Sequence, residues 1–232
     1  MASLYLVATP IGNLGDITLR ALETLKAVEV IACEDTRHSL GLLTHFGIRK
    51  TLLACHANDE ERGAGRILGL LAEGRDVAYI SDAGTPGISD PGAVAARMAR
   101  EAGYPVIPIP GPSAFAALMS VAGIGGRSVL FDGFPSPKPG RRRSRVVELM
   151  ARDEAFVLYE SPFRIGKLLA DIMAVDPSRT VVVGREMTKI HEEIVAGRAD
   201  EMFARFGAEG AGRGEFALLV APKQKDRSIS EK

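Results

Sequence analysis

The stretch 79–92, Tyr-Ile-Ser-Asp-Ala-Gly-Thr-Pro-Gly-Ile-Ser-Asp-Pro-Gly, limits most strongly what this chain can fold into. It begins inside a short apolar run, residues 77–80, which is bounded by turn formers and predicts a buried strand. The loop that follows holds three glycines and two prolines and almost no bulky side chain. Glycine lets a ligand approach the backbone and proline stiffens a loop, so we predict a ligand-binding loop at the carboxyl end of a strand. The alternative is a loop that only turns the chain.

Strands and helices alternate through the first half of the chain. Strands are predicted at 4–8, 30–33, 51–55, 77–80 and 105–109, with a helix after each of the first four. Asp16 is predicted to cap the first of these helices, and Asp90 with Pro91 to begin the helix that ends near residue 102. Another helix is expected to begin at Pro112 and to end near residue 121. This alternation predicts a mostly parallel sheet with right-handed crossovers.

The second half repeats the α/β pattern. We predict a first domain at 1–115, a second at 116–222 and a polar, disordered tail at 223–232. The strands expected in the second domain are 128–132, 155–159, 180–184, 193–196 and 215–220, and its helices centre on residues 147, 168 and 202. The fold class is therefore α/β, with two α/β domains.

Composition excludes several classes of protein. A chain of 232 residues with 46% hydrophobic and 25% charged residues is an ordinary globular protein, and no apolar run approaches the roughly 20 residues of a membrane span. Two cysteines in strand-like contexts suggest a reduced, cytoplasmic protein. The four histidines lack zinc-ligand spacing, so we expect no metal site.

Charge is balanced overall and unevenly spread. Residues 1–112 hold 10 basic and 13 acidic residues, and residues 113–232 hold 19 and 16. Domains that bind nucleic acid are usually distinctly basic, so any contact with a polyanion has to be local.

Several segments resemble one known family. They are 79–92, Val7-Ala-Thr-Pro-Ile-Gly-Asn-Leu-Gly-Asp16, Leu158-Tyr-Glu-Ser-Pro-Phe-Arg164 and Arg185-Glu-Met-Thr-Lys-Ile-His191, and together they extend over most of the chain. They resemble the tetrapyrrole-methylase family, in the branch that methylates small-subunit ribosomal RNA. The resemblance implies two α/β domains with a cofactor cleft between them, a homodimer, and S-adenosylmethionine as the methyl donor. It further implies methyl transfer to the ribose 2′-oxygen of a cytidine in the decoding region of 16S ribosomal RNA, in naked RNA or in the assembled 30S subunit.

The resemblance also carries a set of cofactor-binding residues onto this sequence: Pro10, Ile11, Gly12, Leu14, Ile80, Ser81, Asp82, Thr85, Ser113, Ala114, Tyr159 and Met187. A carboxylate at Asp82 suits the ammonium group and the ribose diol of S-adenosylmethionine, because both donate hydrogen bonds. The alternatives are that Asp82 only supports a turn and that Tyr159 and Met187 are ordinary core residues.

Two carboxylates are candidates for the acid–base work. Glu34 and Asp35 follow the second predicted strand, on the rim that carries the glycine-rich loop. Methyl transfer to a hydroxyl requires alignment and loss of the hydroxyl proton, so Glu34 is our first candidate for a general base and Asp35 the second. The alternative is that Glu34 pairs with Arg37, three residues later, and has no chemical role.

One dense basic run is the candidate surface for RNA. It holds Lys138, Arg141, Arg142, Arg143 and Arg145, and Arg164, Arg185 and Lys189 are candidates to extend it. Cations in the first turns of a helix are disfavoured by its dipole, so contact with phosphate would explain the run. The alternative is a solvated or disordered loop.

Two other functions remain open at this point. A methylase of a tetrapyrrole or another small molecule would keep the cofactor residues and give the basic run no role. A non-catalytic nucleotide-binding module would bind a ligand without turnover, and changing Glu34 would then have no effect.

Overall fold

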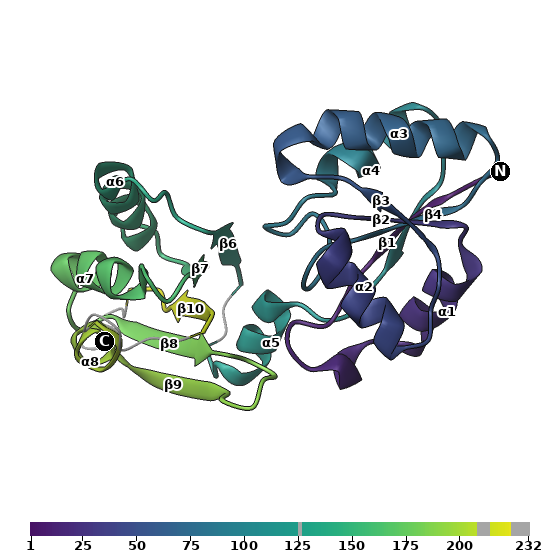
Figure 1. The fold of residues 1–232 in the computed structure, drawn as a ribbon. Helices are drawn as coiled ribbons and strands as arrows, with labels where there is room; N and C mark the ends of the chain where they lie inside the picture. Colours follow the sequence, from purple (N-terminus) through teal and green to yellow (C-terminus); the bar gives the residue numbers. More distant parts are fainter. Residues whose placement is uncertain (125–126, 208–213, 224–232) are drawn as a thin grey trace. The chain divides into compact units, whose positions relative to one another are not determined.

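The computed structural model describes residues 1–124, 127–207 and 214–223. Its contacts divide the chain into two compact units, Met1–Ser113 and Ala114–Lys232 (Figure 1). The predicted tail lies outside the described residues, apart from Lys223.

Unit 1 is built on a five-stranded sheet in the order β3-β2-β4-β1-β5. Its elements are β1 (Leu4–Val7), η1 (Leu14–Asp16), α1 (Leu19–Ala27), β2 (Val30–Cys33), α2 (Thr36–His45), β3 (Thr51–Ala54), η2 (Ala57–Asp59), α3 (Glu60–Ala72), β4 (Val77–Ile80), α4 (Ala93–Glu101) and β5 (Val106–Ile109). All the strand pairings in this sheet are parallel, which confirms the prediction.

Helices cover both faces of this sheet. Helices α3 and α4 pack on one face and α1 and α2 on the other (Figure 1). The inner strands β2 and β4 are buried along their whole length. Strands covered on both sides read as continuous apolar runs, which is why their ends were predictable to the residue.

Three predicted helix starts are wrong. Asp16 ends η1, and Thr18 caps α1 by accepting a hydrogen bond from the Ala21 amide at 3.1 Å. Helix α4 begins at Ala93 behind Gly92, whose φ of 128° only glycine adopts readily, so Asp90 and Pro91 stay in the loop. Helix α5 begins at Ala114 rather than Pro112.

Unit 2 has a mixed sheet in the order β6-β7-β10-β8-β9. Its elements are α5 (Ala114–Val121), β6 (Val129–Gly133), α6 (Pro139–Met150), β7 (Ala155–Glu160), α7 (Ile165–Val175), β8 (Thr180–Arg185), β9 (Glu193–Arg198), α8 (Ala199–Phe206) and β10 (Phe216–Val220). Strands β6 and β7 are parallel, and the other pairings are antiparallel.

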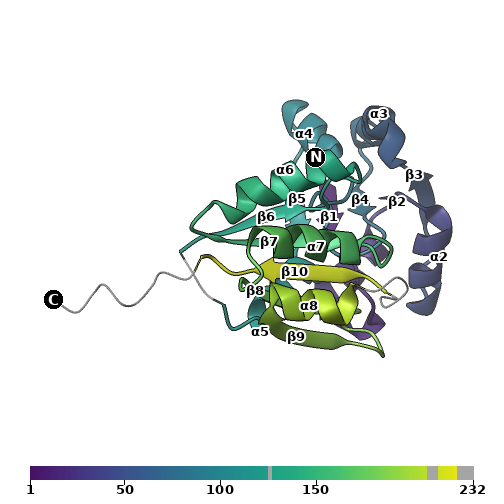
Figure 2. The same ribbon diagram turned by 90° about the vertical axis from the view of Figure 1, so that its left-hand side faces the viewer.

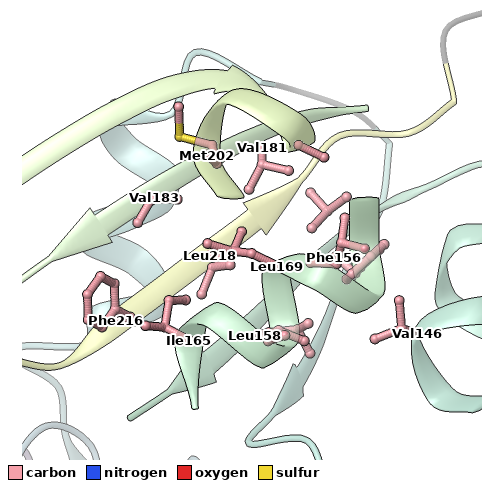
Figure 3. Close-up of a cluster of buried hydrophobic side chains, with 14 of the residues drawn as sticks. Val146, Phe156, Leu158, Ile165, Leu169, Val181, Val183, Met202, Phe216 and Leu218 are labelled. Carbon is pink, nitrogen blue, oxygen red and sulfur yellow. The ribbon is translucent and has the colours of Figure 1, made fainter. Parts of the chain in front are cut away.

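The core of unit 2 lies between this sheet and three helices. Helices α6, α7 and α8 cover one face (Figure 2), and α5 packs on the other. Figure 3 shows Phe156, Leu158 and Leu218 of the sheet lying against Leu169 of α7 and Met202 of α8. Among the described residues, no helix is long and apolar enough to cross a membrane.

Candidate functional site

The glycine-rich loop after β4 is tied to the loop after β1. Thr9 and Gly84 exchange two backbone hydrogen bonds of 2.9 and 3.0 Å, forming an isolated antiparallel bridge. The Thr9 hydroxyl donates to the Ser81 carbonyl at 3.1 Å. Sequence analysis missed Thr9, because its partners lie more than 70 residues away and nothing local signals them.

The same loop is also tied to the segment after β5. The Thr85 hydroxyl donates to the Pro112 carbonyl at 3.0 Å. Gly84 has a φ of 80°, and a Cβ on it would lie 3.4 Å from Ile11 Cγ2. Gly111 lies against Ala8, the residue that follows β1, since a Cβ on Gly111 would meet the Ala8 Cβ at 3.0 Å. Three strand exits therefore form one braced rim with few side chains in it, the kind of surface that a ligand can approach along the backbone.

The polar groups of this rim have different tasks. Ser81 is 2% exposed, and its hydroxyl lies 3.3 Å from the carbonyl oxygens of Ala83 and Gly84, so it shapes the loop. Asp82 accepts a hydrogen bond from the Asp35 amide through Oδ1 at 3.3 Å, and within the described residues its Oδ2 has no hydrogen-bond donor. Asp82 is thus a rim side chain with an acceptor oxygen to offer a ligand.

The other predicted cofactor residues of unit 1 lie along the same rim. In the loop between β1 and η1, Pro10 is buried, Ile11 is half-buried and Gly12 is exposed; Leu14, the first residue of η1, is also exposed. Ile80 is fully buried in the core beneath α1 and α2, so only its backbone can reach a ligand.

Glu34 and Asp35 are adjacent in sequence and stand in opposite environments. Burial, followed by the charge of Asp82, raises the pKa of the Glu34 carboxyl. Hydrogen bonds from the Arg37 side chain and amide hold the pKa of Asp35 at about 2. Asp35 caps α2 and pairs with Arg37 at 3.0 Å, so the pairing of Glu34 with Arg37 that we considered does not form.

Tyr159 and Met187 pack in unit 2 on the α5 side of its sheet. The Tyr159 ring makes edge contacts with Phe131 and Phe134, with centroids 5.0 and 5.6 Å apart. Met187 is 8% exposed and lies against Gly184, where a Cβ would come within 2.6 Å of its sulfur. Ser113 and Ala114, the last predicted cofactor residues, stand at the division between the two units, and both are half-buried.

The basic run proves to be the helix α6, and two of its arginines serve the fold. Arg142 is 4% exposed, and its Nε lies 2.6 Å from Asp171 Oδ2 in α7. Arg145 pairs with Asp132 and Glu148. The assignment of Arg142 to an RNA surface is therefore corrected, because the side chain is enclosed in the protein.

The remaining predicted RNA contacts divide by exposure. Lys138 and Arg141 are exposed and have no ion pair among the described residues, and Arg143 has a 71% exposed side chain although it also contacts Asp171. Three others are held by acidic neighbours: Arg164 by Glu160, Arg185 by Glu193, and Lys189 by Glu186 and Glu215. In the part of the chain that the structure describes, no cluster of side chains could hold a metal ion.

Comparison with known proteins places the chain in a family. The sequence model of the family of tetrapyrrole (corrin/porphyrin) methylases matches residues 3–202. This range includes every strand of the two sheets except β10. This chain is a member of that family.

Relatives within the family are similar along nearly the whole chain. A protein of Borrelia garinii subsp. bavariensis named "Ribosomal RNA small subunit methyltransferase I" is 45% identical over 94% of this chain and 98% of its own length. Proteins of the same name from Neisseria meningitidis serogroup B and Escherichia coli O157:H7 are 43% and 45% identical. They are matched over 97% and 94% of this chain and over 78% and 77% of their own lengths.

Solved structures show the same fold at lower identity. The methyltransferase CobJ superposes with a TM-score of 0.73 at 18% identity, covering 96% of this chain and 95% of that protein. A uroporphyrin-III-C-methyltransferase of Thermus thermophilus gives 0.68 at 22% identity, covering 95% and 94%. The tetrapyrrole-methylase fold predicted from the sequence is confirmed.

Proposed function

We propose that this tetrapyrrole-methylase family member transfers a methyl group from S-adenosylmethionine to the ribose 2′-oxygen of a cytidine in the decoding region of 16S ribosomal RNA. The observation that carries the proposal is the 45% sequence identity, over almost the full length of both chains, to a protein named for methylation of small-subunit ribosomal RNA. In this proposal the partner is the small ribosomal subunit or its RNA, and the protein acts in the cytoplasm as a homodimer.

The rim of unit 1 fits the methyl donor in its chemistry. Gly84 and Gly111 let the loops pack closely against Ile11 and Ala8, which keeps the rim low in side chains. Among the described residues Asp82 Oδ2 has no donor, so it can accept a hydrogen bond from an ammonium or hydroxyl group. The loops after β1, β4 and β5 would therefore hold the donor. When bound, S-adenosylmethionine supplies a methyl group on a sulfonium, which is already a good leaving group.

The task left to the protein is to place the 2′-hydroxyl and to accept its proton. Glu34 suits the second task, because a carboxylate with a raised pKa is a stronger base than its exposed counterpart. Asp35 does not, since its oxygens already accept hydrogen bonds from Arg37. We therefore propose Glu34 as the general base and treat Asp35 as the helix cap that fixes the chain beside it.

The proposed RNA surface on unit 2 includes only part of the basic run, because Arg142 and Arg145 form ion pairs within the fold. Lys138, Arg141 and Arg143 lie at the start of α6 with exposed side chains, and Arg143 also pairs with Asp171. Such contacts with phosphate make affinity salt-dependent.

The test is transfer of a labelled methyl group from S-adenosylmethionine to unmodified small ribosomal subunits, with nuclease mapping of the labelled nucleotide. Label on a cytidine ribose is the expected result. Label on no RNA, in a sample that binds the donor, would refute the substrate assignment and favour a small-molecule methylase.

Two variants test the base within the same assay. Glu34→Gln should lower kcat by about 10²- to 10⁴-fold and leave donor affinity unchanged. Asp35→Asn is the matched control, because asparagine also caps helices and the rate should stay within a few-fold of wild type. An equal loss of kcat in Glu34→Gln and Asp35→Asn would show that the effect is not specific to Glu34 and would exclude Glu34 as the general base.

A further inference from the structure

A small cavity lies directly beside Glu34, where β3 leaves the sheet. The Cys55 amide donates to the Cys33 carbonyl at 2.8 Å, so the ladder between β2 and β3 continues to the last residue before Glu34. In this register Glu34 lies opposite Cys55, which lines the cavity, and the backbones of the two neighbouring strands are about 4.8 Å apart. His56, the next residue of the cavity wall, is close enough to Glu34 to interact with it electrostatically. The cavity measures about 230 Å³ and is lined by Ala54, Cys55, His56, Asp59, Arg62, Gly63 and Arg66.

Close packing of α3 builds the wall of this cavity. A Cβ on Gly63 would lie 3.0 Å from the Cys55 Cβ, so glycine lets the helix approach the strand exit. Arg62 and Arg66 are four residues apart and so share one face of α3, above that exit. Arg66 is fixed there by a hydrogen bond to the Ala54 carbonyl at 3.2 Å.

The cavity has an excess of positive charge. Its single carboxylate, Asp59, lies 3.8 Å from Arg62, and both side chains are largely exposed. Cys55 is neutral, because burial raises its pKa to about 11. Two arginines four residues apart on a helix repel each other, and a bound anion would relieve that repulsion. The volume falls below the roughly 300–1,000 Å³ of pockets for whole small molecules, so the occupant is a compact anionic group.

We propose that this cavity binds a backbone phosphate of the substrate RNA, next to the ribose that is methylated. The inference rests on the proposed function and adds a substrate-positioning site in unit 1. A nucleotide whose 2′-hydroxyl meets Glu34 carries its phosphates only a few bonds away. The rim itself presents Glu34, Asp35 and Asp82, which repel a polyanion, so cations at its border are needed to hold the RNA there.

Salt-dependent binding tests this site without relying on turnover. The affinity of wild type, Arg62→Gln and Arg62→Gln/Arg66→Gln for unmodified small ribosomal subunits is measured from about 50 to 200 mM salt at constant magnesium. Arg62→Gln should weaken binding about two- to fivefold and make the plot of log K against log salt shallower by about one. The double variant should extend both effects, and donor affinity should not change. Because the Arg62 side chain is 81% exposed, the Arg62→Gln protein should have the same Tm as the wild-type protein.

The matched control is Arg49→Gln. Arg49 is exposed just before β3 begins, at the amino-terminal end of the strand whose other end leads to the cavity, so its loss removes the same charge from the same unit. An unchanged salt slope in Arg62→Gln, or a slope equal to that of Arg49→Gln, would overturn the inference. So would weaker donor binding, since the cavity would then hold the carboxylate of S-adenosylmethionine.

The two proposals fail separately. If wild type methylates RNA and the Arg62→Gln slope is unchanged, the cavity inference fails and the function stands. If no RNA is methylated while the slope depends on Arg62, the cavity binds RNA and the proposed reaction is wrong.

Discussion

Replacing Arg142 by alanine should destabilise unit 2 severely and leave affinity for RNA intact in the folded protein. Arg142 is 4% exposed and lies 2.6 Å from Asp171, which is 7% exposed. Removing one partner of a buried ion pair costs about 3–5 kcal/mol, because the remaining charge stays buried without its partner. Arg143 still contacts the other Asp171 oxygen at 3.0 Å, so we expect the lower end, about 3 kcal/mol. For a unit of this size that lowers the Tm by about 10 °C.

Calorimetry on three variants checks this reasoning. Arg142→Ala should show the large loss, and Arg142→Met/Asp171→Leu should recover most of it, because an apolar pair of similar volume leaves no buried charge. Arg141→Gln, one residue away and exposed, should change stability by less than about 0.5 kcal/mol and weaken RNA binding instead. If the Arg142→Ala protein has the same Tm as the wild-type protein but loses affinity for small ribosomal subunits, the structural role proposed for Arg142 is refuted.

Two further predictions concern unit 1. The Arg37 side chain holds the pKa of Asp35 at about 2, below its usual 3.8, so the pair stabilises the fold above about pH 4 and loses this effect as the pH falls toward 2. Asp35→Asn has no carboxylate to protonate, so between about pH 4 and pH 2 it should lose less stability than the wild-type protein. Acid titrations followed by circular dichroism measure this difference. Gly92→Ala should cost about 1–3 kcal/mol in denaturant unfolding, since φ is 128° and the new Cβ would lie 3.2 Å from Pro86 and 3.3 Å from Tyr79. Gly69→Ala, in the interior of α3 with open space around it, should instead be neutral or gain up to about 1 kcal/mol, and equal effects would contradict the role of backbone strain.

The strands of unit 1 were predictable because burial on both faces leaves a simple apolar signal. Strands β2 and β4 begin and end where the sequence turns polar. Helix starts were less predictable, because a cap depends on backbone angles that distant contacts impose. Asp90 has the right side chain for a cap, yet the chain enters α4 through Gly92, and Gly87 bonds back to the Pro91 carbonyl at 3.2 Å.

The burial of Arg142 could have been predicted from the helical spacing of its neighbours, but the basic composition of the run suggested an exposed surface instead. Its spacing to Val146, Leu149 and Met150 follows one helical face, and all four are buried in α6. A dense run of arginines suggests an exposed basic surface when only the composition is considered. The helical period, in contrast, places Arg142 on the buried face of α6 and Arg141 and Arg143 outside it. The partner, Asp171, lies 29 residues away on α7 and could not be predicted from local pattern.

The two carboxylates after β2 show how the fold can decide a chemical role that sequence leaves open. Sequence places Glu34 and Asp35 equally well at the rim. Helix α2 begins at Thr36, so the residue before it must cap the helix, and the Asp35 carboxylate accepts the Arg37 amide at 2.8 Å and its guanidinium at 3.0 Å. A carboxylate saturated with donors is a weak base. Glu34 precedes the cap, and burial and the neighbouring charge of Asp82 make its ionised form less stable, so it holds a proton more readily. The start of α2 thus divides the pair, leaving Glu34 as the carboxylate that can accept a proton beside the braced rim.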